Sequence, residues 1–424
     1  MTEKSTKPQL RFAGFDDTWE QRKLGEVLIS LQNNTLSRAD LSSEEGIAKN
    51  IHYGDILVKF GEVIDVKTES LPMIANETVI AKYKSSFLQN GDVIVADTAE
   101  DETVGKCTEI AGLSDEIVIS GLHTIPYRPL QKYAPGYLGY YMNSASFHNQ
   151  LLPLMQGIKV TSISKTALQN TDILYPKSAT EQAAIGKYFR NLDNLITLHQ
   201  RKYDKLTNVK KSMLEKMFPK NGSNVPEIRF KGFSDAWEQR KLGEIADKVT
   251  EKNGGLQYIE TFTNSAEFGI ISQRDFFDHD IAKIESLNGY YIVRNEDFVY
   301  NPRISTSAPV GPINRNKLGR IGVMSPLYTV FRPHDVDTTY LEHFFKSKYW
   351  HSFMNYNGDS GARSDRFSIK DSVFFEMPIP IPHIEEQRKI GAYLFHLDNL
   401  ITLHQRELEK LKNLKKACLE KMFV

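Results

Sequence analysis

Five carboxylate side chains crowd residues 92–102. Hard divalent cations prefer oxygen ligands of this kind, although a solvated acidic loop is the commoner reason for such a run. The ligands of other metal sites are missing, because no HExxH pattern occurs among the eleven histidines and the two cysteines, Cys107 and Cys418, stand alone. We therefore predict no metal site in this chain.

Two further patterns bear on catalysis. Asn301-Pro302-Arg303 matches part of the Asn-Pro-Pro-aromatic signature of adenine methyltransferases, but the second proline and a glycine-rich methyl-donor motif are both absent. We interpret these three residues as a turn after a strand. The GxxxxGK[ST] loop that holds nucleotide phosphates is absent as well. Catalysis by this chain is therefore unsupported.

The chain contains a duplicated segment, which predicts how its helices and strands are arranged. The ten residues LDNLITLHQR at 192–201 recur unchanged at 397–406, which is 205 positions later. They lie within two longer similar segments, 181–218 and 386–423, that each begin with EQ and end with LEKMF. Apolar residues recur in both at spacings of three and four, so each segment is predicted to be one long helix with a coiled-coil seam. At ~1.5 Å per residue such a helix spans on the order of 55 Å, and the other copy is its expected partner.

The start of each unit is duplicated too. WEQRKLGE at 19–26 recurs at 237–244, but here the offset is 218 positions. The first unit therefore carries 13 more residues than the second. Because QNGDVIV (89–95) matches RNEDFVY (294–300) at an offset of 205, the extra residues must precede the first of these two segments.

Between the repeated ends, short β-branched and aromatic runs bounded by Gly, Asn, Asp and Pro predict strands. Two stretches, 137–152 and 340–356, are predicted to be short amphipathic helices. The expected fold class is therefore α+β, with two mixed α/β globules that are each followed by a long helix. The predicted strands lie within residues 51–60, 92–97, 116–128, 289–303 and 322–332. The predicted domains are a first globule at 1–176, a first long helix at 177–219, a second globule at 220–382 and a second long helix at 383–424.

Composition narrows the class of protein. The 424 residues carry 53 basic and 53 acidic side chains, so any basic surface must be local. This length predicts two or more domains. The low cysteine count, the polar N-terminus and the lack of a long apolar run predict a cytoplasmic protein without a disulfide framework, signal peptide or membrane span.

The combination of these segments resembles the specificity subunit of type I restriction–modification systems. The similarity extends over nearly the whole chain. It is carried by the proline-bearing lead-in MPIPIPHIEEQRKIGAYL (377–394), its weaker copy ILYPKSATEQAAIGKYF (173–189), the LDNLI helix segments and the GDILV run at 54–58. The weaker copy departs from the pattern because it has a single proline, Pro176, but the EQxxI helix start follows intact.

The resemblance implies a function and a set of partners. Each globule would be a target-recognition domain that binds one half of a split site in double-stranded DNA. The long helices would pack as an antiparallel coiled coil with pseudo-two-fold symmetry and hold the globules at a fixed separation. Two methyltransferase subunits and two restriction–translocase subunits would bind the chain, and S-adenosylmethionine, ATP and Mg would belong to those partners, so this non-catalytic chain itself would hold no cofactor. The implied partner-binding framework residues are Trp19, Leu24, Trp237, Leu242, Leu195, Leu198, Leu400 and Leu403.

Base recognition needs few side chains, since Arg or Lys suits guanine edges, Asn or Gln suits adenine, and basic or hydroxyl groups hold phosphates. Two glycine-containing loops just before the long helices, 156–165 and 357–370, each place a cation two residues after a glycine. For any single residue of this kind, a solvated surface cation is the alternative. The predicted DNA-binding residues are Lys159, Arg363, Arg366, Lys165, Lys370, Gln156, Asn357, Lys82, Lys84, Arg303 and Arg315.

Two other classes of function stay open at this point. The first is a binding scaffold in which a duplicated coiled coil presents two protein-binding globules, which a zero net charge allows. The second is a stand-alone methyltransferase or nuclease, which the missing motifs disfavour. A steep salt dependence of binding to duplex DNA would separate DNA recognition from the scaffold.

Overall fold

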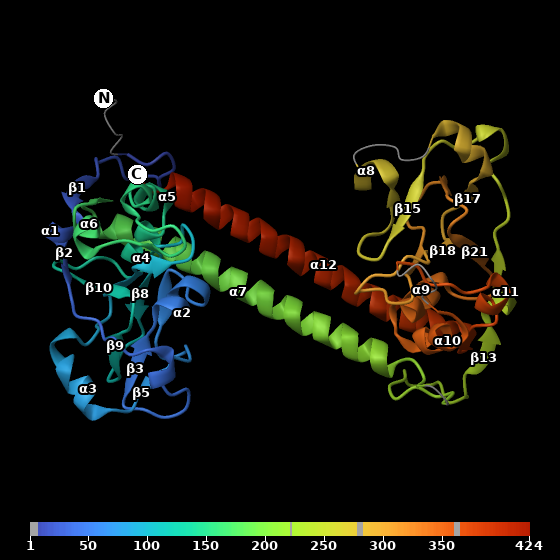
Figure 1. Cartoon of the computed structure of the whole chain (residues 1–424), viewed down its shortest axis with the longest axis horizontal. Coiled ribbons are helices and arrows are strands. Elements are labelled where there is room, and N and C mark those ends of the chain that lie inside the picture. The colour runs from blue at the N-terminus through green and yellow to red at the C-terminus, as the bar shows by residue number, and fades with distance from the viewer. Residues whose placement is uncertain (1–6, 221–222, 278–282, 360–364) are drawn as a thin grey trace. The chain divides into compact units, whose positions relative to one another are not determined.

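The computed structural model describes residues 7–220, 223–277, 283–359 and 365–424. Contacts divide the chain into two compact units (Figure 1), which are unit 1 (Met1–Gln200 with Arg406–Val424) and unit 2 (Arg201–Gln405). Each unit thus combines a globule with parts of both long helices, a grouping that the predicted domain boundaries do not follow. Within the described residues, no helix combines the length and the apolar composition needed to cross a bilayer.

The two long helices are α7 (Ala179–Lys216) and α12 (Ile384–Lys421), each of 38 residues. The Ser178 hydroxyl accepts a hydrogen bond from the backbone N–H of Glu181 at 3.3 Å, which caps the start of α7. In unit 1 the helix segments run antiparallel, because Tyr188 meets Cys418 and the later Asp193 meets the earlier Lys415. The predicted long helices and their antiparallel pairing are confirmed there.

Unit 1 is a mixed α/β globule built on three sheets and a short strand pair. Its strands are β1 Glu20–Lys23, β2 Leu28–Ser30, β3 Ala48–Ile51, β4 Val63–Asp65, β5 Met73–Ile74, β6 Val93–Ala96, β7 Thr98–Ala99, β8 Cys107–Ala111, β9 Ile117–Ser120, β10 Thr124–Pro129, β11 Thr161–Ser162 and β12 Asp172–Tyr175. Its short helices are α1 Leu24–Val27, η1 Arg38–Asp40, α2 Tyr53–Val58, α3 Glu77–Lys82, η2 Lys84–Ser86, α4 Tyr137–Met142, α5 Ala145–His148, η3 Leu152–Leu154 and α6 Lys165–Gln169.

Unit 2 is a second mixed globule. Its strands are β13 Glu238–Lys241, β14 Ala246–Lys248, β15 Phe262–Ser265, β16 Gly269–Ser272, β17 Tyr291–Val293, β18 Phe298–Tyr300, β19 Ile313–Arg315, β20 Gly322–Met324, β21 Thr329–Pro333 and β22 Pro378–Ile381. Its short helices are η4 Leu242–Glu244, η5 Gly254–Leu256, α8 Gln273–Phe277, η6 Ile284–Gly289, α9 Thr338–Lys346, α10 Tyr349–Asn357 and α11 Asp371–Phe374.

The central sheets of the two units share the order of four strands, and unit 1 adds β4 at one edge. The strand order is β2-β10-β6-β8-β4 in unit 1 and β14-β21-β18-β19 in unit 2. Val93 pairs with Glu109 in β8, and its repeat partner Phe298 pairs with Arg315 in β19. The strand that opens each unit also pairs with the last strand before the long helix, as β1-β12 and β13-β22. The two globules are therefore two versions of the same framework.

One predicted strand is wrong. Residues 53–58 form helix α2, where the sequence pattern of 51–60 predicted a strand. The ring Nδ1 of His52 accepts the backbone N–H of Gly54 at 3.2 Å, and Asp55 lies in the first turn, so both satisfy the N-terminal end of the helix. The predicted short helices within 137–152 and 340–356 are confirmed.

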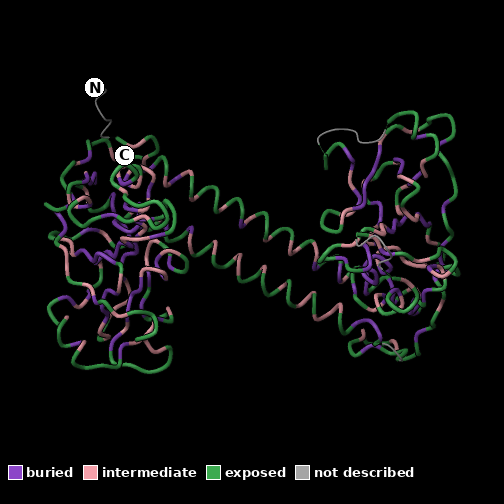
Figure 2. Tube along the Cα trace, viewed as in Figure 1, coloured by how far each residue is buried: buried purple, intermediate pink, exposed green. Residues whose placement is uncertain are grey.

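The C-terminal end of each long helix completes a hydrophobic core. In unit 1, Phe423 stacks on Phe189 at 5.7 Å between ring centroids and meets Trp19 edge-on at 6.3 Å. In unit 2 the repeat partner Phe218 lies 6.5 Å from Trp237. Figure 2 shows buried segments gathered inside the globules, while exposed and intermediate residues predominate along the middle of α7 and α12.

Candidate nucleic-acid interface

The described ends of the predicted loop at 357–370 of unit 2 pair with each other as the two arms of a hairpin. Asp359 and Ser368 exchange backbone hydrogen bonds of 3.1 and 2.6 Å. A Cβ added at Gly358 would lie 2.5 Å from the Ser368 carbonyl oxygen, so this position requires glycine for the close approach. The predicted residue Arg363 lies outside the described residues.

The base of this hairpin brings Arg303 and Arg366 together as antiparallel bridge partners. The backbone N–H of Phe367 donates to the Pro302 carbonyl oxygen at 2.8 Å. Side chains directly opposite each other on an antiparallel pair share a face, and like charges there repel. Among the described residues no carboxylate pairs with either guanidinium, although Arg303 is exposed and Arg366 half-buried. The arrangement is therefore suited to receive an anion or a hydrogen-bond acceptor from outside the protein.

Unit 1 carries a hairpin at the corresponding place. Gln156 and Ser162 exchange backbone hydrogen bonds of 2.9 and 2.8 Å. Gly157 has a φ of 116°, and a Cβ there would lie 2.0 Å from the Val160 carbonyl oxygen, so the tight turn depends on glycine. The tip presents Lys159 to solvent beside a fully exposed Ile158.

The two hairpins are joined to their sheets in the same register. In unit 1, Ile163 N donates to the Asp97 carbonyl oxygen at 2.9 Å, as Phe367 N does to Pro302 in unit 2. In unit 1 this makes Thr98 and Ser162 the bridge partners. Two hydroxyl side chains thus occupy the positions that two arginines occupy in unit 2. We call Thr98/Ser162 and Arg303/Arg366 the paired positions.

The sequence patterns missed the unit 1 pair and its surroundings. The Thr98 hydroxyl donates to Asp97 Oδ1 at 2.8 Å and lies 3.4 Å from His123 Nδ1. His123 has a φ of 55°, a left-handed conformation that is uncommon outside glycine, and its ring contacts Tyr53. No motif marks these residues, because strand pairing alone brings them together.

The other predicted DNA-binding residues lie near the hairpins or elsewhere on unit 1. Gln156 and Lys165 flank the unit 1 hairpin and are exposed. Lys370 follows the unit 2 hairpin as the N-cap residue of α11, and the Asn357 side chain donates to the Phe353 carbonyl oxygen at 2.9 Å. Lys82 in α3 and Lys84 in η2 are exposed, and no described contact joins them to the unit 1 hairpin.

The structure corrects the prediction that Arg315 binds DNA. Its side chain is 7% exposed, and its Nη2 lies 2.6 Å from Glu342 Oε2. Its Nη1 also lies 3.0 Å from Glu296 Oε2 and 2.8 Å from the Thr338 hydroxyl. These partners hold the guanidinium between the central sheet and α9, where it cannot reach DNA.

Four of the implied partner-binding residues are also corrected. The exposed fractions of Trp19 and Trp237 are 3% each, and Leu24 and Leu242 are wholly buried, so they support the core of their own unit. The helix residues differ from these four, because Leu195, Leu198 and Leu403 are 43%, 46% and 51% exposed and Leu400 is half-buried.

The acidic run at 92–102 is divided by the fold. Asp92 is buried and pairs with Arg128 at 2.8 Å. Burial raises the pKa of this carboxyl, against the opposing hydrogen bond from Arg128. In the described part of the chain, no group of three or more His, Cys, Asp or Glu side chains is placed to hold a metal ion.

Comparison with known proteins identifies the family to which this chain belongs. The type I restriction modification DNA specificity domain matches the chain twice, over residues 16–208 and 234–413. The chain belongs to this family. It is a specificity subunit of a type I restriction–modification system, and its two units each contain most of one specificity domain.

Individual relatives agree with this family. A putative type I restriction enzyme MjaX specificity subunit of Methanocaldococcus jannaschii is 25% identical over 94% of this chain and 91% of its own length. The MjaVIII specificity subunit of the same organism is 25% identical over 62% of this chain and 63% of its own length. The type I S subunit from M. genitalium has the same fold, with a TM-score of 0.54 and 13% identity over 99% of both chains.

Proposed function

We propose that each unit of this specificity subunit reads one half of a bipartite DNA site through its hairpin and its paired positions. The observation that carries the proposal is the common register of Thr98/Ser162 and Arg303/Arg366. One framework thus presents different hydrogen-bonding groups at one place in each unit. Arginine suits the O6 and N7 acceptors of guanine, whereas serine and threonine accept several partners.

The paired backbone segments fit this role because hydrogen bonds hold them next to the paired positions in both units. Cations at Lys159 and Lys370 are exposed beside the paired positions in sequence and suit phosphate contacts. In unit 2, Arg366 also lines a cavity of about 470 Å³ together with Tyr291 and Tyr328, which gives room for a nucleotide edge. Hydroxyls in one unit and guanidiniums in the other predict unlike half-sites.

The subunit acts, in this proposal, as the non-catalytic recognition component of a larger complex. Two methyltransferase subunits and two restriction–translocase subunits would carry the chemistry, with S-adenosylmethionine, ATP and Mg bound to them. The exposed leucines Leu195 and Leu198 in unit 1 and Leu403 in unit 2 are the proposed contacts of each unit with these partners.

The test is an exchange of residues 27–176 for the matching segment of another specificity subunit. The chimera is expressed with its methyltransferase subunits, and genomic methylation is mapped by sequencing. One half-site should change and the other should stay as in the parent chain. If both half-sites stayed unchanged, recognition would lie outside the globules and the proposal would be wrong.

A further inference from the structure

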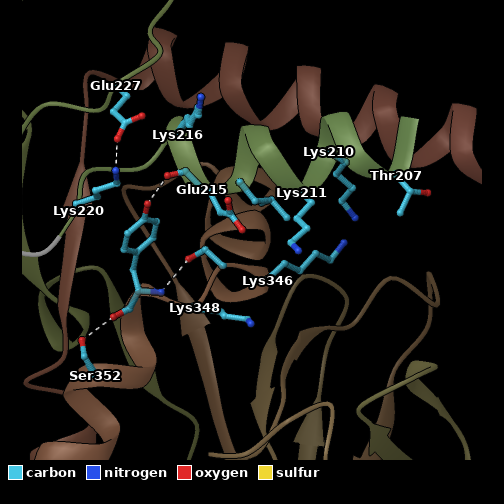
Figure 3. A pocket seen from close by; sticks show the side chains of 13 residues that line it. Thr207, Lys210, Lys211, Glu215, Lys216, Lys220, Glu227, Lys346, Lys348 and Ser352 are labelled. Carbon is cyan, nitrogen blue, oxygen red and sulfur yellow. Dashed lines mark hydrogen bonds and ion pairs between the residues drawn. The ribbon is translucent and has the colours of Figure 1, made fainter. Parts of the chain in front are cut away.

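A lysine-rich cleft lies in unit 2, where the last turns of α7 face the corner between α9 and α10. The cleft has a volume of about 820 Å³. We call it the lysine cleft after the six lysines that line it, Lys210, Lys211, Lys216, Lys220, Lys346 and Lys348. Figure 3 shows Lys210 and Lys211 extending from α7 toward the same space as Lys346.

Half of these charges are compensated and half are not. Lys210 pairs with Asp398, Lys220 pairs with Glu227, and Lys346 lies 2.9 Å from Glu342. Lys211, Lys216 and Lys348 are exposed and form no ion pair with a carboxylate among the described residues, although Glu215 and Glu227 also line the cleft. The cleft therefore holds uncompensated positive charge on two of its walls.

Unit 1 has a cleft at the repeated position but with balanced charge. This second cleft has a volume of about 550 Å³ and is lined by three lysines and three carboxylates. Lys415 and Lys416 take the places of Lys210 and Lys211 in the repeat. Asn143 and Ala145, however, stand where unit 2 has Lys346 and Lys348, and Glu62 pairs with Lys415 at 2.6 Å. The excess of positive charge is thus a property of unit 2 and not of the shared framework.

We propose that the lysine cleft binds the phosphate backbone of duplex DNA, as a sequence-independent contact in addition to the half-site contacts. Lysine is a compact point charge that binds phosphate well. A framework surface for an identical acidic partner on both units would also carry the same charge twice, and these clefts do not. This inference rests on the proposed DNA-binding function.

The test is the triple variant Lys211→Gln, Lys216→Gln and Lys348→Gln in the full chain purified with its methyltransferase subunits. Binding to a duplex with the mapped bipartite site and to a scrambled duplex is measured at several salt concentrations. Each lost phosphate contact lowers the slope of log K against log salt by roughly 0.9, so the expected decrease is up to roughly 2.7. Affinity should fall on both duplexes by a similar factor of about tenfold or more.

Two control proteins make the result specific. Arginine at the same three positions keeps the charge and should restore the salt slope. The matched unit 1 variant Lys412→Gln, Lys416→Gln and Lys421→Gln removes the same number of exposed lysines and should change the slope by less than half as much. A thermal unfolding curve like that of the wild type confirms that each variant is folded.

Other outcomes overturn the inference. An unchanged salt slope in the lysine-cleft variant, with sequence-specific binding intact, would contradict the proposed phosphate contact but not the proposed recognition of the half-sites. Loss of the methyltransferase subunits with an unchanged slope assigns the cleft to an acidic protein partner instead. A wild-type complex that binds both duplexes equally well contradicts the proposed function itself.

Discussion

The two units join their central sheet to the following helix through an acidic side chain in unit 1 and a basic side chain in unit 2. In unit 1 the buried Glu109 accepts the backbone N–H groups of Gly136 at 2.6 Å and Gly139 at 2.9 Å. In unit 2 the strand register puts Arg315 at this place, paired with Glu342 in α9. A buried polar side chain of either kind is tolerated when the neighbouring helix supplies its hydrogen-bond partners. The duplicated framework therefore keeps the backbone positions of the two units alike, while the buried side chains at those positions can differ in type.

The exchange has opposite electrostatic consequences. Burial raises the pKa of Glu109 to about 7, against the opposing backbone hydrogen bonds. In unit 2, burial would raise the pKa of Glu342, but the charge of Lys346, a hydrogen bond from Lys317 and the charge of Arg315 together lower it to about 2. The interior of unit 1 favours a protonated carboxyl, and that of unit 2 favours an ionised one.

The prediction with the largest expected effect concerns a buried arginine–glutamate pair that both units contain. Arg11 pairs with Glu181 at 2.6 Å and Arg229 pairs with Glu386 at 2.7 Å, and these carboxylates are 1% and 0% exposed. Arg11→Ala and Arg229→Ala each leave a buried carboxylate without its cation, so each should destabilise its own unit by about 3–5 kcal/mol. Urea unfolding, combined with hydrogen exchange to assign the loss to a unit, measures this.

The control for that pair is Arg22→Ala. Arg22 is 55% exposed and pairs with Glu20, so its removal should change stability far less than the removal of Arg11 or Arg229. A large loss in one unit and none in the other would contradict the common framework.

The second prediction concerns the pH dependence that separates the units. Folded unit 1 retains the Glu109 proton between the ordinary pKa of 4.5 and about 7, while the unfolded chain releases it. The stability of unit 1 should therefore fall as pH rises through this window, by at most about 3 kcal/mol. Glu109→Gln cannot titrate and should remove the part of this fall that Glu109 contributes. Thermal unfolding of both proteins across that pH range is the measurement.

Unit 2 provides the internal comparison for that experiment. The contribution of Glu342 is present above its ordinary pKa of 4.5 and is lost as pH falls toward about 2. Hydrogen exchange should accordingly report unit 2 as the part that acid weakens. Equal pH profiles in the two units would refute the proposed reversal of charge.

The third prediction concerns the paired positions and is smaller. Arg366→Ala should cost about 1–3 kcal/mol of discrimination at one base pair of one half-site. Ser162→Ala should cost less, and in the other half-site only. Binding to duplexes with single base substitutions resolves both effects. Arg388→Ala, at an exposed arginine in the first turns of α12, is the control and should leave base preference unchanged.

The smallest expected effect on stability belongs to the exposed helix leucines. Leu198→Ser and Leu403→Ser should each change the free energy of unfolding by no more than about 0.5 kcal/mol, because these side chains are 46% and 51% exposed. They should nevertheless weaken assembly with the methyltransferase subunits, measured by size-exclusion chromatography. Leu130→Ser, at a leucine 62% exposed on the unit 1 globule, should leave assembly unchanged.

The local sequence pattern was enough to predict most helices and strands, but it was not enough to predict which residues form the candidate DNA-binding site. The spacing of apolar residues predicted both long helices, because a helix repeats its neighbours every three or four residues. The same cues misassigned α2, where a cap and a first-turn carboxylate outweighed a β-branched run. The glycine-containing loop singled out Arg366, but no pattern distinguished Arg303 from Arg315, although the fold buries Arg315 and pairs Arg303 with Arg366.

By itself, the sequence determined that this protein is a duplicated unit with two long helices, since those properties follow from repeats and periodicity along one dimension. Tertiary structure alone decided which side chains meet, because strand register joins Thr98 to Ser162 and Arg303 to Arg366 across long stretches of chain. The burial of a residue likewise depends on which other elements pack against it, and the local sequence does not specify those elements. For this reason Glu109 and Arg315, which no sequence motif relates, hold the same place in the two units.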